Sequence, residues 1–193
     1  MQTAYIGMGA NLASRVGPPD ATLATVASRF GSLGRVTARS SLYSTKPVGF
    51  ADQPRFTNAV VGLETRLEPR PLLDALLDLE RAFGRNRAEA FRNGPRTLDL
   101  DILLFGNIQR SEPCLQIPHP RLAERAFVLI PLNEIAHGVV VPPHGKTVRQ
   151  LLDALLERHK RAPYEVELLQ SELWHRGPVR APASPADRGS KAR

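Results

Sequence analysis

The sequence predicts a mixed α/β (α+β) fold, a single three-layer domain with a ferredoxin-like βαββαβ core and additional helices. Short apolar strand patterns alternate with longer helical ones, and the first 105 residues follow the order β, α, β, β, α, β. The length of 193 residues suits one domain with a sizeable core, and no internal repeat interrupts the succession.

The core elements follow from hydrophobic periodicity and from turn residues. In order, we expect a strand at 4–8, a helix after residue 20, strands at 36–43 and 57–65, a helix at 69–83 and a strand at 98–105. Gly9-Ala10-Asn11 is expected to form a turn, and Asp20 to cap the first helix. Pro69 and Gly84 suit the start and the end of the second helix.

The remaining elements are more broken. Prolines predict short helical pieces rather than one helix over 122–136. Thr147 is expected to cap a last helix, whose core face carries Leu151, Leu152, Leu155 and Leu156. Residues 164–168 suit an edge strand.

Composition sets the expected domain boundaries. Residues 1–160 form the domain, 161–176 an extension and 177–193 a disordered basic tail, since the tail has a single valine as its only sizeable apolar residue.

Charge and composition exclude several classes of protein. The net charge is +7, and residues 158–193 contribute eight Lys/Arg and four Asp/Glu. A single cysteine, Cys114, rules out an internal disulfide framework. No apolar run approaches the ~20 residues of a membrane helix, and the first residues lack a signal-peptide pattern. We therefore expect a cytoplasmic protein without a membrane partner, and a monomer.

Two aspartates stand two residues apart in Arg96-Thr97-Leu98-Asp99-Leu100-Asp101. Side chains alternate between the faces of a strand, so Asp99 and Asp101 are expected to project together. Adjacent carboxylates repel each other unless a cation or a proton lies between them. Mg²⁺ meets that need, because it binds through one or two carboxylates together with substrate phosphates. The alternative is an ordinary strand with two surface acids.

Arginines gather just before this strand. Arg85, Arg87, Arg92 and Arg96 fall within twelve residues, among glycine, asparagine and proline. Guanidinium groups pair with phosphate oxygens and keep their charge at any working pH. Acids that hold a metal beside such cations suit a polyphosphate and favour phosphoryl-type transfer. The chain lacks a Walker A motif, so a P-loop enzyme is excluded.

Other residues permit two interpretations. His119, held between two prolines, could reach a phosphate or be an ordinary loop histidine. Asn58 could bind a heterocycle or neighbouring backbone. Phe56 and Phe127 could stack on a flat ring or belong to the core. Glu80 could be a surface acid.

Four segments, in order, resemble the family of 6-hydroxymethyl-7,8-dihydropterin pyrophosphokinases, and the resemblance covers about residues 3–157. These segments are Tyr5-Ile6-Gly7-Met8-Gly9-Ala10-Asn11-Leu12, Asp52-Gln53-Pro54-Arg55-Phe56-Thr57-Asn58-Ala59, Gly94-Pro95-Arg96-Thr97-Leu98-Asp99-Leu100-Asp101, and Ile117-Pro118-His119-Pro120-Arg121 with Arg125-Ala126-Phe127-Val128. The resemblance implies diphosphate transfer from ATP to a pterin alcohol in folate biosynthesis, with AMP released by in-line attack on the β-phosphorus. It also implies closure of an Arg- and Gly-rich loop over the phosphates.

The resemblance also implies roles for individual residues. Asp99 and Asp101 would hold two Mg²⁺ ions, and the catalytic residues would be Arg85, Arg96, Asp99 and Asp101. Contacts to ATP, the co-substrate, are implied for Glu80, Arg87, Arg96, Ile102, His119 and Arg125. Contacts to the pterin are implied for Thr45, Val48, Phe56, Asn58, Asp99 and Phe127, with the two phenylalanines sandwiching the ring.

Several positions depart from the family pattern. Asn93 stands where many members have a tryptophan lid, a place that Phe91 could fill. Cys114 and Gln116 replace an arginine and a threonine of some members. Lys46 replaces a common proline or alanine, and the extension after about residue 160 has no matching counterpart. None of these changes removes a metal or clamp residue.

Two other functions compete with this interpretation. A non-catalytic pterin- or nucleotide-binding paralogue of the same fold would be expected to lose one of the two aspartates, and both are present. A nucleic-acid-binding module fits the positive charge. An RNA-binding sheet needs aromatic residues at alternate strand positions beside basic ones, and 36–43 and 57–65 offer no such pair.

Overall fold

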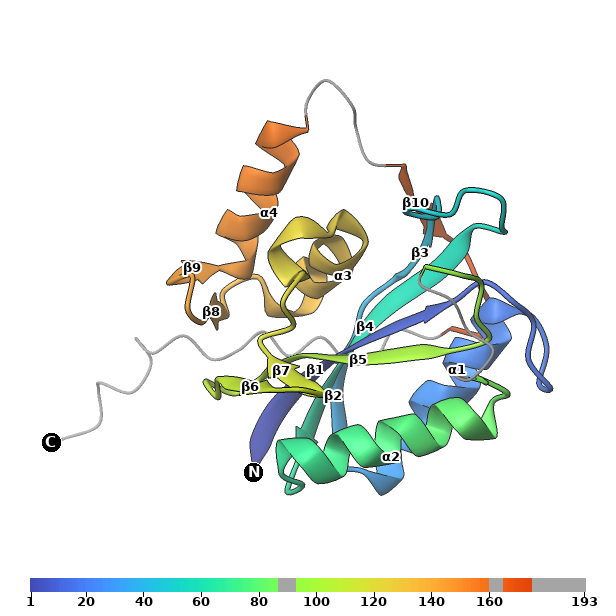
Figure 1. The fold of residues 1–193 in the computed structure, drawn as a ribbon, viewed down its shortest axis with the longest axis horizontal. Coiled ribbons are helices and arrows are strands. Elements are labelled where there is room, and N and C mark those ends of the chain that lie inside the picture. The colour runs from blue at the N-terminus through green and yellow to red at the C-terminus, as the bar shows by residue number, and fades with distance from the viewer. Residues whose placement is uncertain (87–92, 160–164, 175–193) are drawn as a thin grey trace, which may run out of the picture.

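The computed structural model describes residues 1–86, 93–159 and 165–174 (Figure 1). The elements, in chain order, are β1 (Gln2–Ala10), α1 (Pro19–Arg29), the 3₁₀ helix η1 (Phe30–Ser32), β2 (Arg35–Arg39), β3 (Leu42–Thr45), β4 (Phe56–Thr65), α2 (Pro69–Ala82), β5 (Asp99–Phe105), β6 (Arg110–Glu112), β7 (Leu115–Ile117), the 3₁₀ helix η2 (Leu122–Glu124), α3 (Ala126–Ala136), β8 (Val140–Val141), β9 (Lys146–Thr147), α4 (Val148–Arg158) and β10 (Val166–Leu169).

The main sheet has six antiparallel strands in the order β10-β3-β4-β1-β5, and β2 also pairs with β4. Strand β1 is central, with Gly9 opposite Asn58 of β4 on one side and opposite Asp99 of β5 on the other. With β2 and β3 taken as one strand position, this order is that of a ferredoxin-like βαββαβ unit, so the predicted fold class is confirmed.

Helices cover both faces of the sheet, which gives three layers (Figure 1). Helices α1 and α2 pack on one face through a core that includes Ile6, Leu76 and Phe83, while α3 and α4 pack on the other through a core that includes Leu103 and Leu129. Each of these large side chains is 1% exposed or less, and burial of one contributes about 1.5–3 kcal/mol. The two cores fix the sheet between its helices.

The strand predicted at 36–43 is two strands, β2 and β3, that follow each other along the same edge of β4. The break falls at Ser40 and Ser41, which are both buried. The Ser40 hydroxyl accepts a hydrogen bond from Val60 N at 2.9 Å and so replaces a backbone carbonyl in the ladder. A side chain that competes with the backbone for its partner explains the interruption.

Three helix predictions also need correction. Helix α1 begins at Pro19 after Pro18, and Asp20 is not its cap; its carboxylate accepts from the Ser171 hydroxyl at 2.8 Å. Proline 131 lies inside the continuous helix α3 instead of breaking it. Leu156 of α4 is 43% exposed rather than part of the core.

The other helix predictions hold. Thr147 forms the expected cap of α4, in a capping box with Gln150. Helix α2 begins at Pro69, and Gly84, with φ +87°, follows its end.

The first glycines do not form the predicted turn. Gly7 and Gly9 lie inside β1, which continues to Ala10. They share one face of the strand, whereas Ile6 and Met8 point into the opposite core. On that face a Cβ at Gly7 would lie 3.2 Å from Leu103 Cδ2 and one at Gly9 3.1 Å from Asn58 Oδ1, so the glycines let side chains of the neighbouring strands approach closely.

The chain beyond α4 returns to the sheet. Strand β10 pairs with β3 at the edge of the sheet and covers 166–169, where the sequence predicts an edge strand over 164–168. The tail expected at 177–193 lies outside the described residues. Among the described residues, helices long and apolar enough to cross a membrane are absent.

Candidate active site

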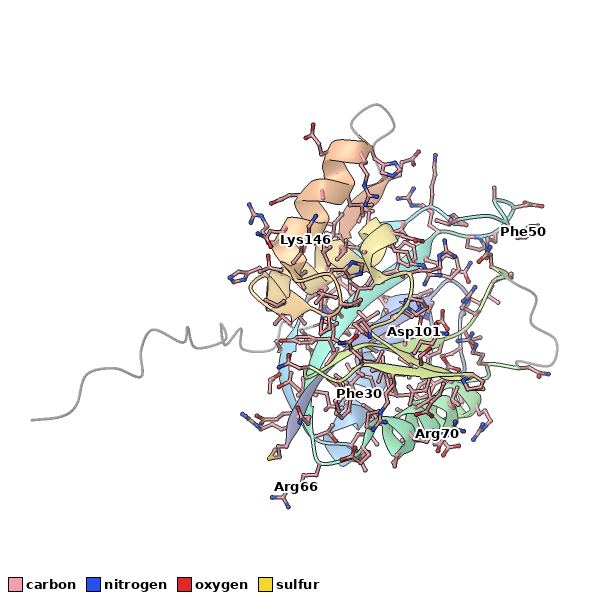
Figure 2. All side chains as sticks on the ribbon, turned by 60° about the vertical axis from the view of Figure 1, so that its left-hand side comes forward. Phe30, Phe50, Arg66, Arg70, Asp101 and Lys146 are labelled. Atoms are coloured by element: carbon pink, nitrogen blue, oxygen red, sulfur yellow. The ribbon has the colours of Figure 1, made fainter. Side chains whose placement is uncertain are left out.

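A cavity of about 200 Å³ opens where the ends of β1, β4 and β5 meet the start of α3. Nine of the residues predicted for the site line it: Thr45, Val48, Phe56, Asn58, Arg96, Asp99, Asp101, Arg125 and Phe127. Figure 2 labels Asp101 near the middle of the molecule and Phe50 on the outer loop between β3 and β4.

Asp99 is clasped by two arginines. Its Oδ1 accepts from Arg85, and its Oδ2 accepts from Arg96 Nη1 at 2.7 Å. Burial acts to raise the pKa of Asp99, but the charges and hydrogen bonds of Arg85 and Arg96 outweigh it and hold that pKa below its ordinary value. Asp99 is therefore an anion throughout the neutral range.

Asp101 shares the cavity face with Asp99, as the strand alternation predicted. Burial, with the added repulsion of Asp99, raises the pKa of Asp101 to about 7, although Arg125 opposes the shift. Its side chain is still 41% exposed toward the cavity. The carboxylate of Asp101 thus has too little positive charge beside it, and a cation could bind there.

The residues present fit a divalent ion completed by a substrate. Groups of three or more His, Cys, Asp or Glu that could hold a metal are absent among the described residues. A closed protein cage for Zn²⁺ is therefore not found there. Two carboxylates open to a cavity instead match Mg²⁺, which keeps waters and takes further oxygens from phosphates.

His119 lies beside the acids without lining the cavity. Its Nδ1 accepts from Arg121 N at 3.1 Å, so its other nitrogen, Nε2, carries the proton of the neutral ring. That nitrogen is 3.9 Å from Asp101 Oδ2. Burial and the charge of Arg125 lower the pKa of His119 to about 4. His119 is thus a neutral N–H donor near Asp101 at neutral pH.

Glu80 corrects one prediction. It is not a surface acid, since it is 1% exposed, and it does not line this cavity, so its contact with ATP stays a prediction. Its Oε1 accepts from Arg85 Nη1 at 2.7 Å and from Leu100 N at 2.8 Å. Glu80 therefore holds Arg85 from behind, while Arg85 holds Asp99.

Two aromatic residues line another part of the cavity, which we call the aromatic slot. Phe56 and Phe127 both line it, and each carries a guanidinium over its ring, Arg96 at 5.5 Å and Arg125 at 5.6 Å from the ring centroid. These contacts join the aromatic slot to the cationic part of the site.

A polar edge completes the slot. Asn58 is buried, and its Nδ2 donates to Thr45 Oγ1 at 2.8 Å. Opposite it, Gly9 has no side chain, and a Cβ there would lie 3.1 Å from Asn58 Oδ1. The glycine thus keeps the amide oxygen of Asn58 open to the cavity, between Asn58 and Asp99 of the adjacent strands.

Some predicted residues lie away from the cavity. Arg85 contacts Asp99 from outside the lining, and Ile102, 5% exposed, belongs to the core under α1 and α2. The contact of Ile102 with ATP stays a prediction. Arg87, Phe91 and Arg92 lie outside the described residues.

Sequence reasoning missed the residues that tie the loops together. Asn11 Nδ2 donates to Gln53 Oε1 and Pro54 O, at 2.9 and 3.0 Å, and its Oδ1 accepts from Arg96 N at 2.7 Å. Gln53 in turn donates to Asn93 O at 2.7 Å. The signal available in the sequence was the place of Asn11 and Gln53 inside the two resembling segments.

Comparisons with known proteins point in one direction. The family model described as 7,8-dihydro-6-hydroxymethylpterin-pyrophosphokinase (HPPK) matches residues 5–137. A Pseudomonas aeruginosa protein named 2-amino-4-hydroxy-6-hydroxymethyldihydropteridine pyrophosphokinase is 44% identical over 156 residues, 80% of this chain and 92% of that protein. A Haemophilus influenzae protein of the same name is 46% identical over 142 residues, 74% of this chain and 86% of that protein.

A solved structure agrees in fold. The wild-type HPPK-DHPS of Plasmodium falciparum superposes with a TM-score of 0.64 at 16% identity, covering 83% of this chain and 46% of that one. The chain thus spans less than half of that longer protein, and at this identity the likeness concerns the fold alone.

Proposed function

This chain belongs to the 7,8-dihydro-6-hydroxymethylpterin-pyrophosphokinase family, and we propose that it transfers the β,γ-diphosphate of ATP to 6-hydroxymethyl-7,8-dihydropterin, a step of folate biosynthesis, releasing AMP. One observation carries the proposal: two neighbouring aspartates, of which Asp99 is bound by two arginines, and two phenylalanines all line a single cavity. Nothing in the comparisons favours a non-catalytic paralogue.

Cations around the acids suit the donor triphosphate. Arg96 and Arg125 line the cavity, and Arg121 lines it beside them. Arg125 has a lowered pKa, because it is buried and lies near Arg121, so an anion between these two guanidiniums relieves their repulsion. The neutral His119 adds an N–H donor for a phosphate oxygen. These groups would orient the β-phosphorus.

Asp99 and Asp101 would hold two Mg²⁺ ions, together with oxygens of the bound ATP. When bound, Mg²⁺ neutralises charge that develops on the transferred and leaving oxygens. The raised pKa of Asp101 in the metal-free site supports this assignment, because that carboxylate needs a cation to ionise fully at neutral pH.

The aromatic slot suits a flat, bicyclic pterin. Phe56 and Phe127 would contact the two ring faces, while Asn58 would read the polar edge with its open amide oxygen. Thr45 fixes the orientation of that amide by accepting its N–H. The acceptor hydroxymethyl group would then face Asp99, since Gly9 leaves the space between Asn58 and Asp99 free.

The reaction balances as a direct transfer. The hydroxymethyl oxygen forms a bond to the β-phosphorus, the bond from that phosphorus to the oxygen shared with the α-phosphate breaks, and the hydroxyl proton passes to water. Little covalent chemistry falls to the protein, so its residues act by positioning and by charge. Arg85 and Arg96 would act on the transition state while holding Asp99 in place.

The product nucleotide tests the proposal. With ATP, the pterin alcohol and Mg²⁺, we expect AMP and the pterin diphosphate in equal amounts, and none with EDTA. Formation of ADP, or AMP formation independent of the pterin, would contradict diphosphate transfer to this acceptor. The monomeric state and the cytoplasmic location stay predictions, which sedimentation and fractionation of cells would check.

A further inference from the structure

The segment 165–174 lies beyond residues 5–137, which the family model matches, and returns to the edge of the sheet beside the cavity. Strand β10 pairs along all of β3, with Val166 opposite Thr45 and Leu169 opposite Leu42. Thr45 lines the cavity and accepts from Asn58. Strand β3, which carries Thr45, is thus flanked on both sides, by β4 and by β10.

The far end of the segment is anchored in the core. Trp174, the single tryptophan of the chain, is 7% exposed and donates from Nε1 to Ser40 O at 2.7 Å. The guanidinium of Arg39 lies 5.7 Å from its ring. Because Ser40 stands at the break between β2 and β3, this anchor holds the segment against the start of β3.

Acidic residues at the start of the segment form ion pairs with basic residues that flank the aromatic slot. Glu165 forms an ion pair with Lys46, which lines the cavity directly after Thr45. Arg55, the residue before Phe56, contacts Glu165 at 3.5 Å and Glu167 at 3.1 Å. Arg55 also donates to Ser44 Oγ at 2.8 Å. Both bases are adjacent in sequence to residues of the slot.

We propose that residues 165–174 are a positioning element for the acceptor side of the site, and that Glu165 is a positioning residue that acts through Lys46. Lys46 is a long, flexible cation, 61% exposed, at the wall of a cavity that already holds arginines. Glu165 neutralises its charge and restricts where its ammonium lies. The inference rests on the proposed function, because it assigns a role in binding the pterin.

The ion pair between Glu165 and Lys46 predicts a change in the KM for the pterin. Glu165→Gln keeps the side-chain shape and removes the charge, so we expect the KM for the pterin to rise about two- to fivefold, the range that an exposed ion pair supplies. The KM for ATP and kcat change by less than about 1.5-fold. In a Lys46→Met background, Glu165→Gln raises the pterin KM less than it does in the wild type, because of its two ion pairs only the longer one with Arg55, at 3.5 Å, is left to lose.

Two controls separate positioning from folding. Asp153→Asn breaks a comparably exposed ion pair with Arg149 on α4, and leaves both KM values unchanged. Fluorescence of Trp174 without ligand reports whether the segment stays docked, and it is the same in Glu165→Gln as in the wild type. An unchanged pterin KM, or an equal rise in the Lys46→Met background, would overturn the inference. Wild-type protein that forms no AMP would instead contradict the proposed function.

Discussion

Substitution of Glu80 tests whether its buried carboxylate holds Arg85 in place. Its carboxylate is 1% exposed and accepts from Arg85 at 2.7 Å and from Leu100 N at 2.8 Å. Glu80→Ala takes one carboxylate from the buried guanidinium of Arg85 and leaves the Leu100 N–H without this acceptor. Breaking a buried charge pair costs about 3–5 kcal/mol, and we count the cost of the unpaired Leu100 N–H within that range. We therefore expect the free energy of unfolding to fall by about 3–5 kcal/mol.

Urea unfolding measures this loss, and a matched variant controls for the helix. Asp74→Ala removes an acid from an exposed ion pair with Arg70 on the same helix, α2, and should cost less than about 1 kcal/mol. Glu80→Gln retains an oxygen for the Leu100 N–H and should fall between the two. The rate of AMP formation should fall as Arg85 loses its support, and it should be lowest in Glu80→Ala. A cost below about 1 kcal/mol for Glu80→Ala would refute the reasoning.

Three further predictions follow from single contacts. Gly9→Ala places a Cβ 3.1 Å from Asn58 Oδ1 and should raise the pterin KM at least about tenfold, whereas Gly31→Ala, with open space at its Cβ, should leave it unchanged; steady-state kinetics decide. Asp101→Asn should stabilise the metal-free protein by about 1 kcal/mol at pH 8, measured by urea unfolding in EDTA. The pKa of Asp101 in the folded wild type, about 7, lies above its value in the unfolded chain, so wild-type stability falls as the pH rises toward 7. The difference in stability between the variant and the wild type should therefore vanish near pH 4. Thr147→Ala removes the cap of α4 and should lower the free energy of unfolding by about 1 kcal/mol, and a loss below about 0.3 kcal/mol would contradict that role.

Local rules predicted most of the fold. Alternation placed Asp99 and Asp101 on one face, proline and glycine marked the ends of α2, and Thr147 marked the start of α4. Each of these signals depends on residues close in sequence, so a single pattern carries it. The order of the elements then predicted the sheet.

Several of the errors share a cause in long-range contacts. Ser40 breaks a strand because its hydroxyl meets Val60, and Glu80 is buried because Arg85 and Leu100 lie over it. Gly9 proved to be a strand residue that makes room for Asn58, across the sheet. Periodicity does not report such partners, since they are set by tertiary packing.

The central claim is that Asp101 serves the reaction at a cost to stability, and one variant tests both parts. AMP formation by Asp101→Asn should be measured with ATP, the pterin alcohol and Mg²⁺ at pH 8, beside its free energy of unfolding. We predict at least about a hundredfold loss of rate in a protein as stable as the wild type or more so. A rate within about tenfold of the wild type would contradict the assignment of Asp101 to the metal and the transferred phosphates.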